Sequence, residues 1–252
     1  MLRSTTTVHG IHVFSNDTNI QKQLTAIIEA PKFLKYISNL DKNLLDITEL
    51  RIDAVKWFCN PIQPDPAKLG FLYMELSATD KRNQKPVPGC IFLRGDAVAV
   101  YIRLDVEGTK YVLLTRQLRA PIGGLLDEIP GGMMDEHNCF ASVALKEIQE
   151  ETGLVAPSSD CLVELGPPII PSGGGCDEEI QMYFWETSVT AERFNQMKNK
   201  IFGSVEENES IQLVFIPADE YENHLMTNMR DATSICAHLR ASKMGLLNSI
   251  TK

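Results

Sequence analysis

Residues 132–154, GMMDEHNCFASVALKEIQEETGL, constrain the fold of this chain more than any other stretch. Apolar residues recur here at helical spacing: Phe140, Ala144 and Ile148. This pattern predicts a helix over residues 138–152 that packs one face into a core. Asn138 can cap the start of the helix with its side chain. Gly153 can end it in the left-handed conformation, and Leu154 can make the apolar contact that accompanies such an end.

Three acids lie on one strip of this helix, at positions i, i+3 and i+4: Glu147, Glu150 and Glu151. Two carboxylates at that spacing disfavour each other by about 1 kcal/mol in bulk water, and by more near a protein surface. The helix dipole also disfavours anions at this end. One interpretation is a solvated acidic face with Lys146 as a partner. The other is a divalent cation, because the upstream turn DEIPGG can add backbone carbonyls to an oxygen-only ligand set that suits Mg²⁺ or Mn²⁺.

The composition excludes several classes of protein. A net charge of −9 argues against nonspecific binding to a nucleic acid backbone, which needs a basic face. Since no apolar run approaches the roughly 18–20 residues that span a bilayer, a soluble globular protein is expected. The six cysteines show no metal-site spacing and predict reduced, mostly packed thiols: Cys59, Cys90, Cys139, Cys161, Cys176 and Cys236.

The chain is expected to divide into an N-terminal extension, residues 1–87, and a catalytic domain, residues 88–252. The extension has a helical pattern over residues 18–40 and a strand candidate, FLYMELS. The second part alternates strands with helices, which is typical of an α/β layered domain. Its predicted strands are AVAVYIRL and KYVLLTRQL, which form a hairpin, and LLDEIP, CLVELG, EIQMYFWETSV and IQLVFIP. Its predicted helices cover residues 138–152, 191–199 and 231–243.

The acidic helix resembles the Nudix box, G-x5-E-x7-R-E-U-x-E-E-x-G-U, where U is bulky and apolar. Seven positions match: Gly132, Glu147, Ile148, Glu150, Glu151, Gly153 and Leu154. Asn138 replaces the first glutamate and Lys146 replaces the arginine, a paired loss of two residues that form an ion pair in the family. The resemblance implies an α/β fold, the Nudix α/β/α sandwich with a mixed sheet, plus an N-terminal helix and β extension.

Further stretches resemble the ADP-ribose and nucleotide-sugar diphosphatases of this superfamily: TRQLRAPIGGLLDEIPGGMMDE and PSGGGCDEEIQMYFW. GCIFLRGDAVAV and DATSICAHLRASKMG look most like the plant-type ADP-sugar diphosphatase branch. The resemblance implies metal-dependent hydrolysis of nucleoside-diphosphate sugars, with ADP-sugars favoured, to a nucleoside monophosphate and a sugar 1-phosphate. The alternatives are an ADP-ribose or UDP-sugar diphosphatase, or a non-catalytic Nudix domain that binds a nucleotide.

By the same resemblance, Glu147 and Glu151 are the main metal ligands and the Gly131 carbonyl completes the metal shell. Glu150 is a further ligand or a group that supports the ligands and the catalysis. The cofactor is expected to be Mg²⁺ or Mn²⁺.

The catalytic base is expected outside the box. Glu178 in the glycine-rich loop GGGCDEE is the first candidate, because Gly173 to Gly175 suggest a flexible loop that can bring its acid over the substrate. Glu209 in ENESIQL is the second, and Asp177 and Glu179 stay open as alternatives. Loop acids that are simply solvated are the competing interpretation.

Four residues are expected to contact the substrate. Arg119 matches an arginine that holds the diphosphate, and Arg116 is a weaker candidate; a surface salt bridge is the alternative for each. Glu128 matches an acid that lines the substrate site, where a structural hydrogen bond is the alternative. Trp57 can stack on a nucleobase, but a buried tryptophan is the more common outcome.

The N-terminal extension resembles regions that form the dimer interface in these diphosphatases, so a homodimer is expected, without nucleic acid or membrane partners. A cytoplasmic location is expected. The first residues, MLRSTTTVHGIHVF, have one arginine, several hydroxyls and no acid, and leave organelle targeting as an alternative.

Overall fold

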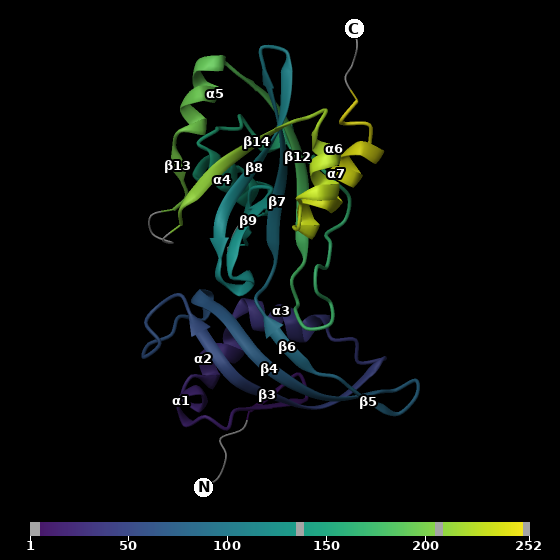
Figure 1. Ribbon diagram of the computed structural model, residues 1–252. Helices are drawn as coiled ribbons and strands as arrows, with labels where there is room; N and C mark the ends of the chain where they lie inside the picture. Colours follow the sequence, from purple (N-terminus) through teal and green to yellow (C-terminus); the bar gives the residue numbers. More distant parts are fainter. Residues whose placement is uncertain (1–5, 135–138, 205–208, 249–252) are drawn as a thin grey trace. The chain divides into compact units, whose positions relative to one another are not determined.

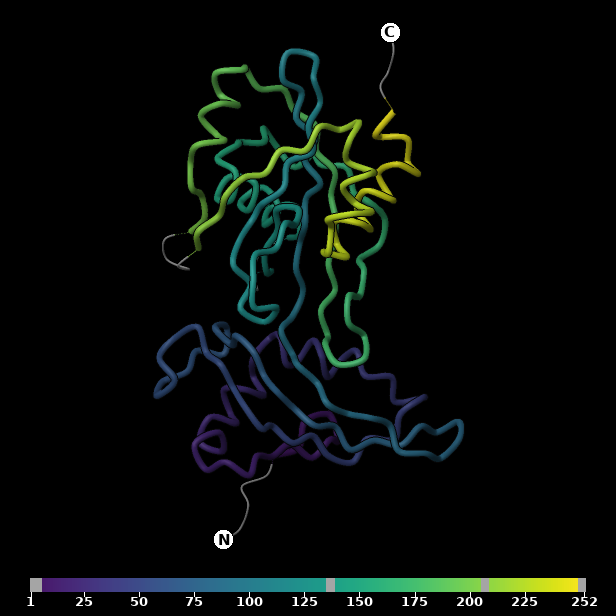
Figure 2. The backbone as a smooth tube through the Cα atoms, viewed as in Figure 1, coloured from purple at the N-terminus to yellow at the C-terminus, as the bar shows by residue number. Residues whose placement is uncertain are grey.

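The computed structural model describes residues 6–134, 139–204 and 209–248. They fall into two compact units (Figure 1). The first comprises Met1–Gly95 with Ser172–Glu178, and the second comprises Asp96–Pro171 with Glu179–Lys252. The sequence grouped residues 88–95 and the loop 172–178 with the second part of the chain, whereas both pack within the first unit. Figure 2 traces this loop as the green segment between two strands of the second unit.

The first unit is a sheet with the strand order β1-β2-β3-β4-β5, in which β6 also pairs with β4. Its strands are β1 (Thr6–Val8), β2 (Ile11–Phe14), β3 (Leu45–Trp57), β4 (Leu69–Asp80), β5 (Lys85–Val87) and β6 (Cys90–Leu93). Its helices are α1 (Thr18–Gln21), α2 (Leu24–Glu29) and α3 (Pro31–Asn39). Apolar side chains of the helices pack with those of the central strands: Ile20, Ile27, Phe33 and Ile37 with Leu50, Ile52, Leu72 and Met74.

The second unit is a mixed sheet with the strand order β11-β12-β7-β8-β14-β13, to which β10 and β9 add beside β7 and β8. Its strands are β7 (Ala97–Val106), β8 (Thr109–Arg119), β9 (Gly124–Glu128), β10 (Gly131–Met133), β11 (Val163–Glu164), β12 (Ile180–Val189), β13 (Ile201–Phe202) and β14 (Ile211–Pro217). Its helices are α4 (Phe140–Thr152), α5 (Ala191–Lys198), α6 (Tyr221–Thr227) and α7 (Ala232–Lys243). The pairing of β12 with β7 is parallel, and the other pairings of this sheet are antiparallel.

Helices cover both faces of this sheet (Figure 1). Strand β7 is buried on both sides, because successive side chains of a strand point to opposite faces. Val98, Val100 and Ile102 pack with α4 and α5. Ala99 and Tyr101 pack with α6 and α7. The predicted α/β/α sandwich with a mixed sheet is confirmed.

Several elements differ from the sequence prediction. The helical pattern over residues 18–40 forms three short helices, with Pro31 starting the third. Strand β3 was not predicted, because register shifts at three points break its alternation of polar and apolar residues. The six cysteines are unpaired, as expected, but none is fully buried, and the thiols of Cys90 and Cys139 are exposed. Among the described residues, no helix is long and apolar enough to cross a membrane.

Candidate active site

Helix α4 carries the acidic strip and ends as predicted. Gly153 has a φ of 67°, in the left-handed region, and its N–H donates to the Gln149 carbonyl at 2.9 Å. Arg193 Nη2 donates to the Gly153 carbonyl at 2.7 Å, which places a positive charge at the negative end of the helix dipole. At the other end Cys139 occupies the cap position, and its side chain makes no capping hydrogen bond to the helix backbone. Asn138, the expected cap, lies outside the described residues.

Glu151 is the most buried acid of the strip. Only 1% of its surface is exposed, and its Oε2 accepts a hydrogen bond from the Gly131 N–H at 2.9 Å. Burial raises the pKa of Glu151 well above its usual range, the nearby charge of Glu147 raises it further, and the bond from Gly131 opposes both. Ionised Glu151 is therefore a buried charge that needs a positive partner.

Glu147 lies against the backbone of Gly132. A Cβ at Gly132 would lie 2.2 Å from Glu147 Oε1, far inside contact distance. The glycine turn is held beside Glu147 because β10 pairs with the start of β7. In this pairing Gly131 lies opposite Ala99 and Gly132 lies opposite Val98. The DEIPGG turn and α4 thus meet through two carboxylate contacts, Glu147 with Gly132 and Glu151 with Gly131.

Glu150 has a different environment from its two neighbours. Its carboxylate is 3.4 Å from Lys146 Nζ, and 37% of its side chain is exposed. This is the ion pair that the alternative interpretation of the strip anticipated, and it accounts for Glu150 alone. Glu147 and Glu151 instead face the glycine turn.

Two acids from distant parts of the sequence lie close enough to act on Glu151 electrostatically. The charges of Glu209 and Glu128 both raise the pKa of Glu151 further, after burial and Glu147. Glu209 accepts the Ser204 N–H at Oε2 (3.3 Å), and the neighbouring Gly203 N–H donates to the Glu150 carbonyl at 3.2 Å. The segment that carries Glu209 is therefore hydrogen-bonded to the last turns of α4.

The two candidate arginines lie on opposite faces of the β8–β9 hairpin. Arg116 lies opposite Asp127 in the strand register, and Glu128 lies opposite Thr115, so the two pairs point to different sides. Thr115 also lies opposite Leu213, which packs with α4. The face of Glu128 is therefore the face of the acidic helix.

Each arginine pairs with the carboxylate on its own face. Arg116 Nε and Nη2 donate to the two oxygens of Asp127 at 2.6 and 2.7 Å. Arg119 Nε donates to Glu128 Oε1 at 2.8 Å. Burial raises the pKa of Glu128, and the charge of Arg119 opposes that rise. Of the two arginines, Arg119 is the one on the same face as Glu147 and Glu151.

Two candidate residues belong to the first unit. Glu178, which is 8% exposed, lies in the glycine-rich loop with its Oε1 3.3 Å from Arg94 Nη1. Trp57 is 6% exposed within the first unit's core, and its indole N–H donates to Gln23 Oε1 at 2.6 Å. The buried alternative for Trp57 is confirmed, because packing covers the ring that would have to stack on a base.

The donors on α4 fit a hard divalent cation. Among the described residues, no three His, Cys, Asp or Glu side chains gather closely enough to hold an ion on their own. Glu147 and Glu151 supply two oxygen donors, one of them buried, and backbone carbonyls of the adjoining glycine turn are the further donors at hand. A cation there would neutralise two like charges that otherwise disfavour each other.

Comparison with known proteins now identifies the family. The model of the NUDIX domain matches residues 93–236. Nudix hydrolase 14, chloroplastic, of Arabidopsis thaliana is 36% identical over 234 residues, which cover 88% of this chain and 74% of that protein. This chain belongs to the Nudix hydrolase family. Nudix hydrolases generally use divalent metals, in agreement with the donors on α4.

Other relatives match shorter parts of this Nudix hydrolase. An uncharacterized Nudix hydrolase of Schizosaccharomyces pombe is 30% identical over 132 residues, 52% of this chain and 56% of that one. A putative Nudix hydrolase of Caenorhabditis elegans is 36% identical over 75 residues, 30% of this chain and 32% of that one. A crystal structure described as an ADP compounds hydrolase aligns with 79% of this chain and 95% of the crystallised chain. The TM-score is 0.51 and the sequence identity is 13%, so this likeness supports the fold alone.

Sequence reasoning missed three contacts of this Nudix hydrolase. Gly132 was matched to the Nudix box without a physical explanation. The explanation is that Glu147 packs against its backbone and leaves no room for a Cβ. Asp127 was not recognised as the partner of Arg116, although alternation along β9 places adjacent acids on opposite faces. Arg94 pairs with Glu178 but lies 84 positions away from it in the sequence, so no local pattern pointed to this pair.

Proposed function

We propose that this Nudix hydrolase cleaves the diphosphate bond of nucleoside-diphosphate sugars, with ADP-sugars favoured, to a nucleoside monophosphate and a sugar 1-phosphate. What supports the proposal is one arrangement: two inward carboxylates of α4, Glu147 and Glu151, share a face of the second unit with Arg119. A cation on the carboxylates and a guanidinium on the same face suit an anionic diphosphate. The preference for ADP-sugars rests on the sequence motifs around the box.

Different residues of this chain have different roles in the proposed reaction. Glu147, Glu151 and the Gly131 carbonyl would hold Mg²⁺ or Mn²⁺, which when bound neutralises phosphate oxygens and lowers the pKa of a water. Arg119 would hold the phosphate oxygens through its planar fork, with Glu128 keeping the guanidinium in place. A carboxylate base would accept a proton from the water as its oxygen bonds to one phosphorus. The bond from that phosphorus to the bridging oxygen breaks, and the second phosphate leaves with that oxygen.

Glu209 is the base in this proposal. Its segment is attached to α4 within the second unit, because the Gly203 N–H donates to the Glu150 carbonyl and the Ser204 N–H donates to Glu209 Oε2. Glu178, the first candidate from the sequence, belongs to the other unit and is paired with Arg94. The attachment of its segment to the last turn of α4 is the observation that favours Glu209.

We expect Glu209→Gln to lower kcat by about a hundredfold or more, because general-base catalysis typically contributes about that much. Glu178→Gln should lower kcat by a clearly smaller factor. Initial rates with saturating ADP-sugar and Mg²⁺ give both values. A larger loss in Glu178→Gln than in Glu209→Gln would move the base to the glycine-rich loop.

A substrate panel tests the proposed reaction. Phosphate release in a phosphatase-coupled assay would be measured with ADP-sugars, UDP-sugars and ADP-ribose in the presence of Mg²⁺. We expect the fastest release with an ADP-sugar, and release that stops when the metal is chelated. Binding of nucleotide without release from any of these compounds would contradict the proposal and point to a non-catalytic Nudix domain.

We also propose a homodimer formed through the N-terminal residues 1–87, on the resemblance of this region to dimerisation segments. Light scattering at micromolar concentration should give twice the 28.1 kDa of one chain. A mass of one chain under those conditions would contradict the proposal.

Targeting to an organelle is a further proposal. It rests on the composition of the first residues and on the chloroplastic designation of the Arabidopsis relative.

A further inference from the structure

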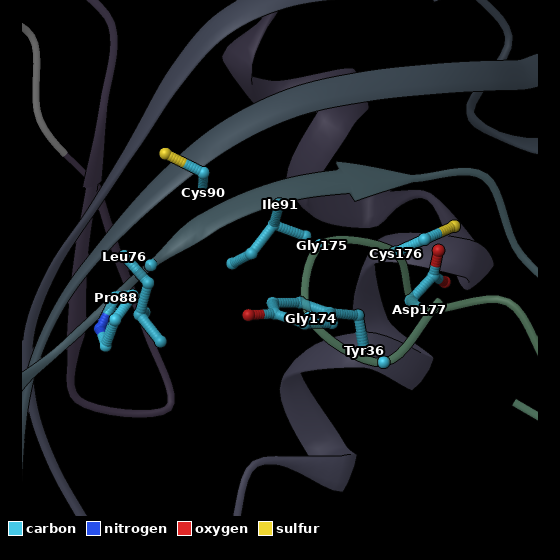
Figure 3. A pocket seen from close by; sticks show the side chains of 11 residues that line it. Tyr36, Leu76, Pro88, Cys90, Ile91, Gly174, Gly175, Cys176 and Asp177 are labelled. Atoms are coloured by element: carbon cyan, nitrogen blue, oxygen red, sulfur yellow. The ribbon is translucent and has the colours of Figure 1, made fainter. Parts of the chain in front are cut away.

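Among the features without a role in the proposed reaction are a cavity and the start of α7. The cavity, of about 210 Å³, lies between β6 and the glycine-rich loop, with Tyr36 of α3 beside it (Figure 3). Its lining residues all belong to the first unit. The start of α7 belongs to the second unit, together with the DEIPGG turn and α4. It can therefore be connected to the acidic helix through contacts within one compact unit.

The start of α7 is organised by Asp231. Its Oδ2 accepts the backbone N–H of Ser234 at 2.7 Å and the Ser234 hydroxyl at 2.6 Å. The first of these bonds caps the helix. The second fixes the direction of the hydroxyl, because a hydroxyl whose hydrogen points to one acceptor presents its lone pairs elsewhere. Ser234 is thus held as an oriented hydrogen-bond acceptor.

The partner of that acceptor is the backbone of the DEIPGG turn. Ser234 Oγ accepts the Ile129 N–H at 3.0 Å, across 105 positions of the sequence. Ser234 is fully buried and Ile129 is 4% exposed. Ile129 lies between β9 and β10, outside the hydrogen-bond ladders of both strands. Because a buried N–H needs a partner, Ser234 supplies the acceptor that the sheet does not.

Four consecutive residues of this turn are each hydrogen-bonded to a different element. The pairs are Glu128 with Thr115 of β8 (3.2 Å), Ile129 with Ser234 of α7 (3.0 Å), Pro130 with Val100 of β7 (2.8 Å) and Gly131 with Glu151 of α4 (2.9 Å). Glu128 binds Arg119, and Gly131 contacts the carboxylate of a proposed metal ligand. Ile129 lies between these two positions, so a shift of its backbone displaces both.

The side chain of Ile129 adds an apolar attachment on the same side. It packs in the core cluster that contains Tyr221 of α6 and Ala237 of α7. This cluster lies on the face of the sheet opposite to α4, whose apolar residues belong to the other cluster. The turn is therefore held from α7 on one face and from α4 on the other.

We propose that Ser234, oriented by Asp231, is a positioning residue for hydrolysis, which holds Ile129 and thereby sets the places of Glu128 and Gly131. The inference rests on the proposed function, because those two residues are assigned to the substrate and the metal there. It gives the segment DATSICAHL a role beyond covering the sheet. The competing role for Ser234 is a hydrogen bond that stabilises the fold without affecting the reaction.

Removal of one hydroxyl tests the proposal. We expect Ser234→Ala to lower kcat by about tenfold or more, since small misplacements of groups around a reacting centre are costly. The Mn²⁺ concentration that gives the half-maximal rate should rise by about threefold or more. Rates are measured with saturating ADP-sugar, well below the melting temperature of each variant.

Ser158→Ala is the matched control, because it makes the same chemical change in the same unit. Ser158 Oγ also accepts a backbone N–H, that of Asp160 at 3.2 Å, but at an exposed position. This variant should leave kcat and the Mn²⁺ dependence unchanged. A loss equal to that of Ser234→Ala would overturn the proposal.

Two measurements on the full-length protein do not depend on activity. In metal-free Ser234→Ala the Ile129 amide should exchange its hydrogen about tenfold faster or more, as expected for the loss of a hydrogen bond. The Gly131 amide should exchange about threefold faster or more, because the displaced turn weakens its bond to Glu151. Free Mn²⁺ measured by electron paramagnetic resonance should give a Kd raised by about threefold or more.

A pair of variants at Asp231 tests the orienting carboxylate and keeps the proposal testable if Ser234→Ala does not fold. Asp231→Asn keeps an oxygen that can accept both bonds from Ser234 and should stay within about twofold of the wild-type kcat. Asp231→Ala removes that oxygen and should lower kcat by about threefold or more. Normal kcat in Asp231→Ala would overturn the orienting role, as would an equal loss in both variants.

The exchange and binding results separate positioning from stability. Faster exchange at Ile129 with normal kcat and normal Mn²⁺ affinity would overturn the positioning role and leave a bond that serves the fold alone. Unchanged exchange at Gly131 would overturn the link from Ser234 to the metal ligands. If the wild-type enzyme hydrolyses no nucleotide sugar, the proposed function fails. Exchange at Gly131 and the Kd for Mn²⁺ then still decide whether Ser234 positions the turn.

Discussion

Glu151→Gln is expected to lower kcat by at least about a hundredfold without unfolding the protein, a loss in the range seen when a preorganised electrostatic group is removed. Glutamine keeps the acceptor for the Gly131 N–H, so the contact between α4 and the glycine turn should survive. The substitution removes the negative charge of Glu151, a residue that is 1% exposed and whose charge is repelled by that of Glu147. The melting temperature of the metal-free variant should therefore equal or exceed that of the wild type. Steady-state kinetics in saturating Mg²⁺ and thermal melting in EDTA measure the two effects.

Glu164→Gln is the control for this experiment, since it neutralises an exposed acid on β11. It should retain normal turnover. Near-normal turnover of Glu151→Gln in saturating Mg²⁺ would refute the assignment of Glu151 as a metal ligand. A large drop in its melting temperature would show that the carboxylate is needed for folding, and the kinetic loss would then carry no information about the metal.

Gly132→Ala is expected to lower kcat/KM by about tenfold or more while the fold is kept. The new Cβ would lie 2.2 Å from Glu147 Oε1, so the carboxylate must leave its place. It can do so at low cost in stability, because it is the end of a flexible side chain. The reaction should nevertheless suffer, since a displaced ligand no longer presents the cation in the productive geometry. Kinetics over a range of Mg²⁺ concentrations, with a thermal melt, would measure both effects.

Gly131→Ala provides the contrast at the neighbouring position. There the new Cβ would lie 2.4 Å from the Val98 carbonyl oxygen, which belongs to the backbone of β7 and cannot move alone. Overpacking of this kind typically costs about 1–3 kcal/mol of stability. Equal loss of stability in the two variants, or normal kcat/KM in Gly132→Ala, would contradict the proposed contact between Glu147 and Gly132.

Much of the second unit could be predicted from local patterns. The end of α4 at Gly153 depends on a left-handed residue and an apolar neighbour that are adjacent in sequence. The β7–β8 hairpin depends on two alternating strands around a turn, and it formed as predicted. The Nudix family was also recognisable from residues 132–154, because the acids and glycines of the box lie at fixed spacing within one stretch of sequence.

Only the tertiary structure showed which of the candidate residues share a face or a contact. Three glutamates that look equivalent on a helical wheel separate into an inward pair and Glu150, which pairs with Lys146. Two arginines three residues apart separate because strand register places Arg116 and Arg119 on opposite faces. The segment that carries Glu209 is hydrogen-bonded to α4 through Gly203, and Asp177 accepts the backbone N–H of Arg94, although both pairs of segments are far apart in the sequence. Periodicity and turn chemistry are local and can be read along the chain, whereas burial, register and loop attachment are set by partners that only folding brings together.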